Sequence, residues 1–143
     1  MLKNLAFEAS SIHSRTDDNR YIYTEREDIL HLMYECNHTH NLFSNLAEWL
    51  VEKGYENLRF SRLDSVFGMV SKEPRDPLNI CLLIARFFIW YCRCTKTPLK
   101  FQAFLKYLRF YVQAIKASSF IRGQEKSFHE EWASLLNWIH QEE

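Results

Sequence analysis

The stretch DPLNICLLIARFFIWYCRC, residues 76–94, decides the fold of this chain. Proline at the first position of a helix loses only an N–H that has no partner there, so Asp76-Pro77 is a strong helix start. The apolar run that follows is 13 residues long and holds one charged residue, Arg86. That length is well short of the roughly 20 residues needed to cross a bilayer. The stretch therefore predicts a buried helix at the centre of the fold, over about 77–95.

Two further helices are predicted downstream. Thr97-Pro98 repeats the helix-start signal, and apolar residues at three- and four-residue spacing continue until Gly123, which should end the helix. Ser127 and Glu130 then have the spacing of a capping box, in which each side chain satisfies a backbone N–H of the other residue. An apolar stripe follows this box and predicts the last helix.

Three helical segments are predicted upstream. Thr24 and Glu27 fit a capping box and should open the first one. A second helix, about 39–53, repeats the apolar spacing until Gly54, a natural left-handed stop. The short stretch SRLDSVFG, residues 61–68, has a serine N-cap at its start and a glycine at its end, which fits one short helix.

The chain is therefore expected to be all-α, with five to six helices packed around the central one. Its 143 residues correspond to about one domain, and a hydrophobic content of 47% is enough for a real core. Only three glycines and three prolines leave little room for a loop-rich β design. Residues 1–23 lack a sustained hydrophobic period and are expected to be a poorly ordered lead-in, so that 24–143 form a single helical domain.

The net charge is zero, but the basic residues concentrate in the second half. Residues 1–70 carry a charge of −4 and residues 71–143 a charge of +4. Between Arg86 and Lys126, nine basic residues and one acid give a segment charge of +8. This asymmetry favours an anionic partner, although exposed helix faces also collect lysine and arginine because these residues keep a surface soluble.

Basic and aromatic residues alternate within residues 93–116, a pattern typical of proteins that bind single-stranded nucleic acid. Basic side chains hold phosphates while exposed aromatic rings stack on bases. The predicted phosphate contacts are Arg93, Lys96, Lys100, Lys106, Arg109 and Lys116. The aromatic residues between them are Phe101, Phe104, Tyr107, Phe110 and Tyr111. The alternative is that Phe104, Leu108 and Tyr111 face the core and only the lysines reach water.

Two residues of the first predicted helix, His31 and Cys36, are of types that bind zinc. A structural zinc site usually takes two ligands from one turn and two from elsewhere, but no cysteine pair precedes these residues. A histidine and a cysteine on a half-buried helix more often pack in the core. The prediction is that no cofactor is bound, with zinc at His31 and Cys36 as the alternative.

No catalytic motif is visible, so the chain is predicted not to be an enzyme. It has no glycine-rich phosphate loop, no Gly-x-Ser-x-Gly elbow and no His-Glu-x-x-His. No signal peptide is visible at the start, and the four cysteines are expected to be reduced thiols, so an intracellular location is expected without choosing between nucleus and cytoplasm. Cys92 and Cys94 would point about 200° apart on a helix and could not bind one ion together.

The order of the motifs resembles the C-terminal region of non-LTR (LINE-type) retrotransposon reverse transcriptases. EDILHLMYECNHTHNLFSNLAEWL, residues 27–50, resembles the end of the zinc-binding segment of that family. RLDSVFG, then NICLLIARFFIWYCRCTKTPLKFQAFLKYL, and finally FHEEW resemble the helical tail that follows it. The resemblance covers about 25–132. It implies that His31 and Cys36 match the last two zinc ligands, while the first two ligands, both cysteines, have no match.

The resemblance also implies that the catalytic polymerase domain would lie upstream and is absent from this sequence. The predicted function is therefore that of a non-catalytic remnant of such a region, which binds RNA or single-stranded DNA through its basic aromatic segment. One alternative is a helical module that binds a protein partner through its aromatic residues. Another is a transposon-derived fragment without a selected function. A membrane is not expected as a partner, and the sequence does not indicate an oligomeric state.

Overall fold

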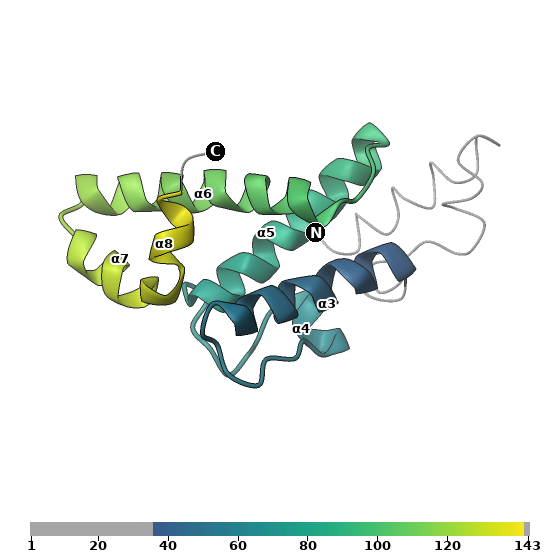
Figure 1. The fold of residues 1–143 in the computed structure, drawn as a ribbon, viewed down its shortest axis with the longest axis horizontal. Helices are drawn as coiled ribbons and strands as arrows, with labels where there is room; N and C mark the ends of the chain where they lie inside the picture. Colours follow the sequence, from purple (N-terminus) through teal and green to yellow (C-terminus); the bar gives the residue numbers. More distant parts are fainter. Residues whose placement is uncertain (1–35, 142–143) are drawn as a thin grey trace.

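The computed structural model describes residues 36–141, and within this range the chain is all-α, as predicted. Its regular structure there consists of six α-helices and one short 3-10 helix. Figure 1 shows helix α5 in the middle, with α3 and α4 to one side and α6 to the other. The predicted lead-in, 1–23, and the helix predicted to begin at Thr24 lie outside the described residues.

Helix α5 (Pro77–Thr95) is the central helix and begins where the sequence predicts. The carboxylate of Asp76 accepts a hydrogen bond from the N–H of Leu78 at 2.9 Å, which caps the first turn. The helix packs against α3, α4 and α6, and Leu82 at its centre is fully buried. Length and composition alone would allow α5 to cross a membrane, but core helices meet the same criteria. Its contacts in this fold are those of a core helix.

Helices α3 (Asn37–Glu52) and α4 (Arg62–Phe67) cover one side of α5. The predicted stop after α3 is confirmed, because Gly54 has a φ of 115°. The predicted cap of α4 is also confirmed: the Ser61 hydroxyl accepts from the N–H of Asp64 at 3.1 Å, and the Asp64 carboxylate accepts from the N–H of Ser61 at 2.9 Å. The main apolar residues that α3 buries are Leu42, Phe43, Leu46, Trp49 and Leu50.

One side chain, Asn79 in the first turn of α5, holds the loop between α4 and α5. Its Oδ1 accepts from the N–H of Met69 at 2.6 Å, and its Nδ2 donates to the carbonyls of Met69 at 3.1 Å and Glu73 at 2.9 Å. Gly68 begins this loop with a φ of 87°, and a Cβ there would lie 3.1 Å from the same Oδ1. The loop is therefore fixed to α5 by a clamp that needs both residues.

Helix α6 (Phe101–Ile121) packs on the other side of α5 and begins three residues later than predicted. The N–H of Thr97 donates to the carbonyl of Cys92 at 2.9 Å, and the hydroxyls of Thr97 and Thr95 lie 2.7 Å apart. Thr97 therefore belongs to the C-terminal turn of α5, and the Thr97-Pro98 signal does not open α6. The predicted end is confirmed, since Gly123 follows the helix with a φ of 71°.

Helix α7 (Glu125–Glu131), a 3-10 turn (Ala133–Leu135) and α8 (Leu136–Ile139) fold back against α6. The prediction of a capping box at Ser127 and Glu130 is wrong, because α7 already begins at residue 125. Ser127 lies inside the helix, and its hydroxyl donates to the carboxylate of residue 131 at 3.2 Å. This return of the chain places α8 beside α6, with α3 beyond it, and forms the groove described next (Figure 1).

Candidate nucleic-acid interface

The six residues predicted to contact phosphates lie in three different places in the fold. Arg93 is the one that is buried. Its side chain is only 7% exposed, and its guanidinium carbon lies 5.2 Å from the centre of the Trp90 ring. The buried cation is held by the aromatic ring that it covers. The prediction that Arg93 contacts a phosphate is therefore wrong, because its side chain packs within the fold.

Lys96 and Lys100 lie in the turn between α5 and α6, and both side chains are exposed. Lys96 ends α5 in the left-handed conformation, with a φ of 56°, and its N–H donates to the carbonyl of Arg93. Lys100 is the N-cap residue of α6. Both cations are therefore accessible to a phosphate at the end of the fold where α5 is connected to α6.

Lys106, Arg109 and Lys116 lie on the flank of α6 that faces α8. The guanidinium carbon of Arg109 is 5.0 Å from the centre of the Trp138 ring, and Lys116 Nζ forms a hydrogen bond with His140 Nε2. Both residues are half-buried, whereas Lys106 is exposed. Two of the three cations therefore also attach α8 to α6, and Lys106 is free of that role.

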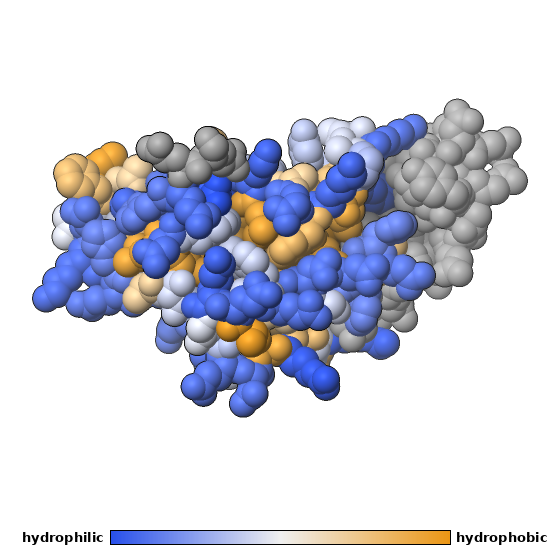
Figure 2. Space-filling view, viewed as in Figure 1, coloured by the Kyte–Doolittle hydropathy of each residue, from blue (hydrophilic) through white to orange (hydrophobic). Residues whose placement is uncertain are grey.

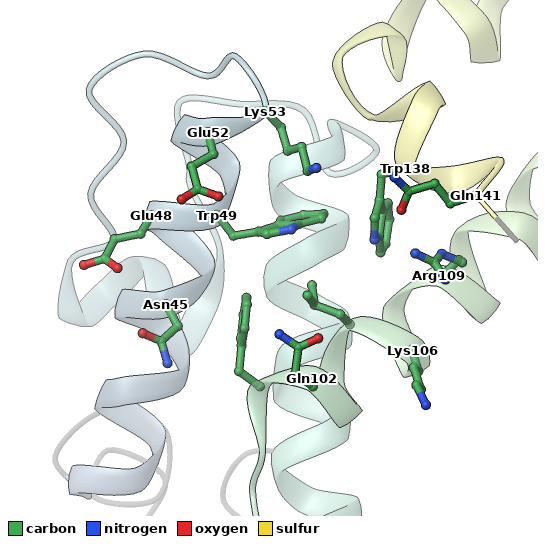
Figure 3. A pocket seen from close by; sticks show the side chains of 12 residues that line it. Asn45, Glu48, Trp49, Glu52, Lys53, Gln102, Lys106, Arg109, Trp138 and Gln141 are labelled. Atoms are coloured by element: carbon green, nitrogen blue, oxygen red, sulfur yellow. The ribbon is translucent and has the colours of Figure 1, made fainter. Parts of the chain in front are cut away.

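A groove of about 580 Å³ lies between α3 and α6 and ends at α8 (Figure 3). On the face drawn in Figure 2, hydrophilic side chains border an apolar seam between α6 and α3. The residues that line the groove are Asn45, Glu48, Trp49, Glu52, Lys53, Phe101, Gln102, Leu105, Lys106, Arg109, Trp138 and Gln141. Apolar rings and a leucine thus lie among polar and charged groups, a common composition for a ligand-binding groove.

Two tryptophans from distant parts of the chain meet in this groove. The rings of Trp49 and Trp138 pack edge to face, with centroids 4.7 Å apart and planes at 75°. Lys53 Nζ lies 5.5 Å from the centre of the Trp49 ring, and Arg109 covers Trp138. The negative face of each indole attracts its cation, so the pair fixes one cation from the end of α3 and one from α6 at the same groove. The sequence interpretation missed Lys53 and both tryptophans.

Two carboxylates, Glu48 and Glu52, also line the groove, so its three cations leave an excess of one positive charge. Figure 3 shows the Glu48 side chain extending from α3 away from α6. The cations of the α6 wall, Lys106 and Arg109, come from the opposite side of the groove. An anion bound along α6 would therefore meet the cationic wall, with this carboxylate directed away from it.

The aromatic residues of the predicted binding segment do not share one surface with the cations. Phe104 is fully buried, as the core-facing alternative predicted, and Phe101 is half-buried at the groove. Tyr107 packs on α5, with its ring 6.0 Å from Tyr91, and Phe110 is 66% exposed. The core-facing alternative is therefore confirmed for Phe104 and wrong for Tyr111, which is 36% exposed, and contact of the other rings with bases stays a prediction.

The zinc site at His31 and Cys36 stays a prediction, because His31 lies outside the described residues. Cys36 is half-buried and is the N-cap residue of α3. Within residues 36–141, no three His, Cys, Asp or Glu side chains gather as metal ligands would. Cys92 is buried and Cys94 exposed, which agrees with the expected divergence of the two thiols.

The shifted pKa values in the described part of the chain follow from burial. Burial raises the pKa of Cys81 and of Tyr55 to about 12, and it also raises the pKa of Cys92. Arg86 has a lowered pKa, again through burial, and its Nη1 donates to the carbonyl of Ser65 at 3.3 Å. These thiols and hydroxyls stay protonated at neutral pH, the state of packed side chains and not of activated nucleophiles.

Comparison of the chain with protein-family models, with curated proteins and with solved structures found no match.

Proposed function

We propose that this chain is a non-catalytic helical module that binds RNA or single-stranded DNA along the groove between α3 and α6. The observation that carries the proposal is the meeting of Lys53, Lys106 and Arg109 around one groove that Trp49 and Trp138 also line. Residues 77–124 contain no acidic residue, so no carboxylate of α5 or α6 opposes a phosphate there. A positively charged groove that follows the backbone is the usual arrangement for single-strand binding.

The groove suits a single strand better than a duplex. Its cations sit in a concave site between two helices, whereas a duplex is read by an element that projects into its grooves. Lys96 and Lys100, in the exposed turn at the start of α6, extend the same charge toward a strand that leaves the groove. The half-buried Phe101 is the ring best placed to meet a base there.

The motif order described above supports an origin in the C-terminal region of a non-LTR retrotransposon reverse transcriptase. In that setting the module would hold template or target nucleic acid beside a polymerase encoded upstream. The proposal assigns no reaction to this chain, and binding does not depend on a metal at His31 and Cys36.

The test is a titration of labelled single-stranded RNA and DNA at two salt concentrations. The slope of log affinity against log salt is about −0.7 per phosphate neutralised, so three to five contacts predict a roughly 20- to 100-fold loss of affinity for a fourfold rise in salt. Lys106→Gln, which removes one exposed cation of the groove, should reduce the slope by about 0.7. Lys72→Gln, an exposed change in the loop before α5, is the matched control and should leave binding unchanged.

Lys53 and Arg109 stay in place in this experiment because they also pack on Trp49 and Trp138. Absence of saturable binding at low micromolar protein and low salt would refute the proposal. Equal losses in the groove variant and in Lys72→Gln would show that general charge, and not the groove, drives binding.

A further inference from the structure

A second surface, on the flank of α6 that faces away from the groove, exposes a connected set of rings. The Tyr91 and Tyr107 ring centroids are 6.0 Å apart, those of Tyr107 and Tyr111 are 5.0 Å apart, and Tyr111 meets Phe110 at 5.4 Å. We call this surface the aromatic face. Its members are Leu83, Phe87 and Tyr91 on α5, at four-residue spacing, and Tyr107, Phe110 and Tyr111 on α6.

The aromatic face is large for a surface in contact with water. Its exposed fractions are 37% for Leu83, 50% for Phe87, 49% for Tyr91, 66% for Phe110 and 36% for Tyr111. At about 200 Å² for each such side chain, these fractions leave roughly 500 Å² of mainly apolar surface exposed. That area is near the upper end for the largest apolar patch of a monomer, about 300 to 600 Å², and such patches are often binding sites.

No member of the aromatic face carries a charge at neutral pH. Burial, together with a hydrogen bond to Tyr111, raises the pKa of Tyr107 to about 12, so its hydroxyl stays neutral. Arg109 and Lys116 of α6 lie on the other flank, where Arg109 meets Trp138 and Lys116 meets His140, and Lys106, one helical turn before Phe110, lies between the two surfaces. Two copies of the chain would repel each other if they met through that basic flank, but not through the aromatic face.

We infer that two copies of this chain pair through the aromatic face, with α5 and α6 of one copy against α5 and α6 of the other. A two-fold contact of this kind buries the same patch on both copies, roughly 1,000 Å² in total, which is the lower bound for a specific interface. A contact of this size is typical of a weak complex, and we expect the dimer to dissociate in the micromolar range. No member of the aromatic face lines the nucleic-acid groove, so pairing does not rest on the proposed function.

The test is sedimentation velocity of the full chain, without nucleic acid, between about 1 and 100 µM, the range set by the small interface. The parent should shift from monomer to dimer across this range. Phe110→Glu should weaken pairing at least tenfold, because it places a carboxylate from each copy in the apolar interface. Phe120→Glu is the matched control: Phe120 is also 66% exposed on α6 but is not a member of the aromatic face. It should pair like the parent.

Phe87→Glu, at a half-exposed position on α5, tests the same interface from the other helix and should also weaken pairing. Circular dichroism melts of all variants establish that each one folds. Three results would overturn the inference. They are a parent that stays monomeric at every concentration, a dimer that survives both Phe87→Glu and Phe110→Glu, and a loss of pairing in Phe120→Glu equal to that in Phe110→Glu.

Discussion

The Asn79 clamp predicts a stability change that can be worked from its hydrogen bonds. In Asn79→Asp, the new carboxylate still accepts from the N–H of Met69, but the two donations to the carbonyls of Met69 and Glu73 are lost. An oxygen then faces those carbonyls at the former donor distances of 3.1 and 2.9 Å. Each lost hydrogen bond costs about 1 kcal/mol, and the repulsion adds to that cost. We expect the free energy of unfolding to fall by about 3 kcal/mol at neutral pH.

This loss should depend on pH, because a protonated carboxyl can donate as the amide does. We expect partial burial and the facing carbonyls to outweigh the N–H of Met69 and the N-terminus of α5, and so to raise the pKa of the new carboxyl in the folded state above the unfolded value of about 3.9. Folding then favours the protonated form. The variant is therefore least destabilised near pH 4, and stability is lost as the pH rises through the folded-state pKa. For each unit by which folding raises this pKa, the difference in unfolding free energy between the variant and the parent grows by about 1.4 kcal/mol between acid and neutral pH.

Urea denaturation followed by circular dichroism, at about pH 4.5 and about pH 7.5, measures both effects. With an m-value of about 2 kcal/mol/M, a loss of 3 kcal/mol lowers the midpoint by about 1.5 M. Asn137→Asp, at an exposed position of α8, makes the same chemical change and should stay within about 0.5 kcal/mol of the parent. If the difference in unfolding free energy between Asn79→Asp and the parent does not grow from about pH 4.5 to about pH 7.5, the hydrogen-bond reasoning is wrong.

Two further changes test other parts of the account. Ser61→Ala removes the cap of α4 and should lower the free energy of unfolding by about 1 kcal/mol in urea denaturation, whereas Ser127→Ala, inside α7, should change it by less than about 0.5 kcal/mol. Equal losses would contradict the assigned helix boundaries. Reductively purified protein is expected to contain no stoichiometric zinc by elemental analysis, and zinc that disappears in both His31→Ala and Cys36→Ala would establish the metal site.

Two helix starts, those of α4 and α5, were predicted correctly from residues that act within one turn, Ser61 with Asp64 and Asp76 with Pro77. The equally local Thr97-Pro98 signal failed because Thr97 takes part in the C-terminal turn of α5. The spacing of a capping box also occurs inside helices, because residues three and four apart share a face there. Ser127 uses that second geometry, and its partner at residue 131 shows that spacing alone cannot separate a cap from an interior pair.

The candidate groove could be predicted only in part, because its walls come from three regions of the chain. Lys106 and Arg109 were identified as cations from the sequence. Lys53 belongs to the half of the chain with net negative charge, and only the contact between Trp49 and Trp138 brings it to the same site. A contact between helices that are distant in sequence leaves no local signal, so composition could indicate the binding class but not the binding site.

The alternation of basic and aromatic residues along α6 has a different meaning once the segment is a helix. Adjacent residues of an α-helix point about 100° apart, so neighbours in sequence are directed to different faces. Lys106 lines the groove, whereas Tyr107 packs against Tyr91 of α5. Alternation that would build one mixed surface on an extended segment therefore builds two surfaces on a helix, one cationic and one aromatic. Few side chains belong to both the cationic groove and the aromatic face. Substitutions in the groove should therefore weaken nucleic-acid binding without changing pairing, and substitutions in the aromatic face should weaken pairing without changing nucleic-acid binding.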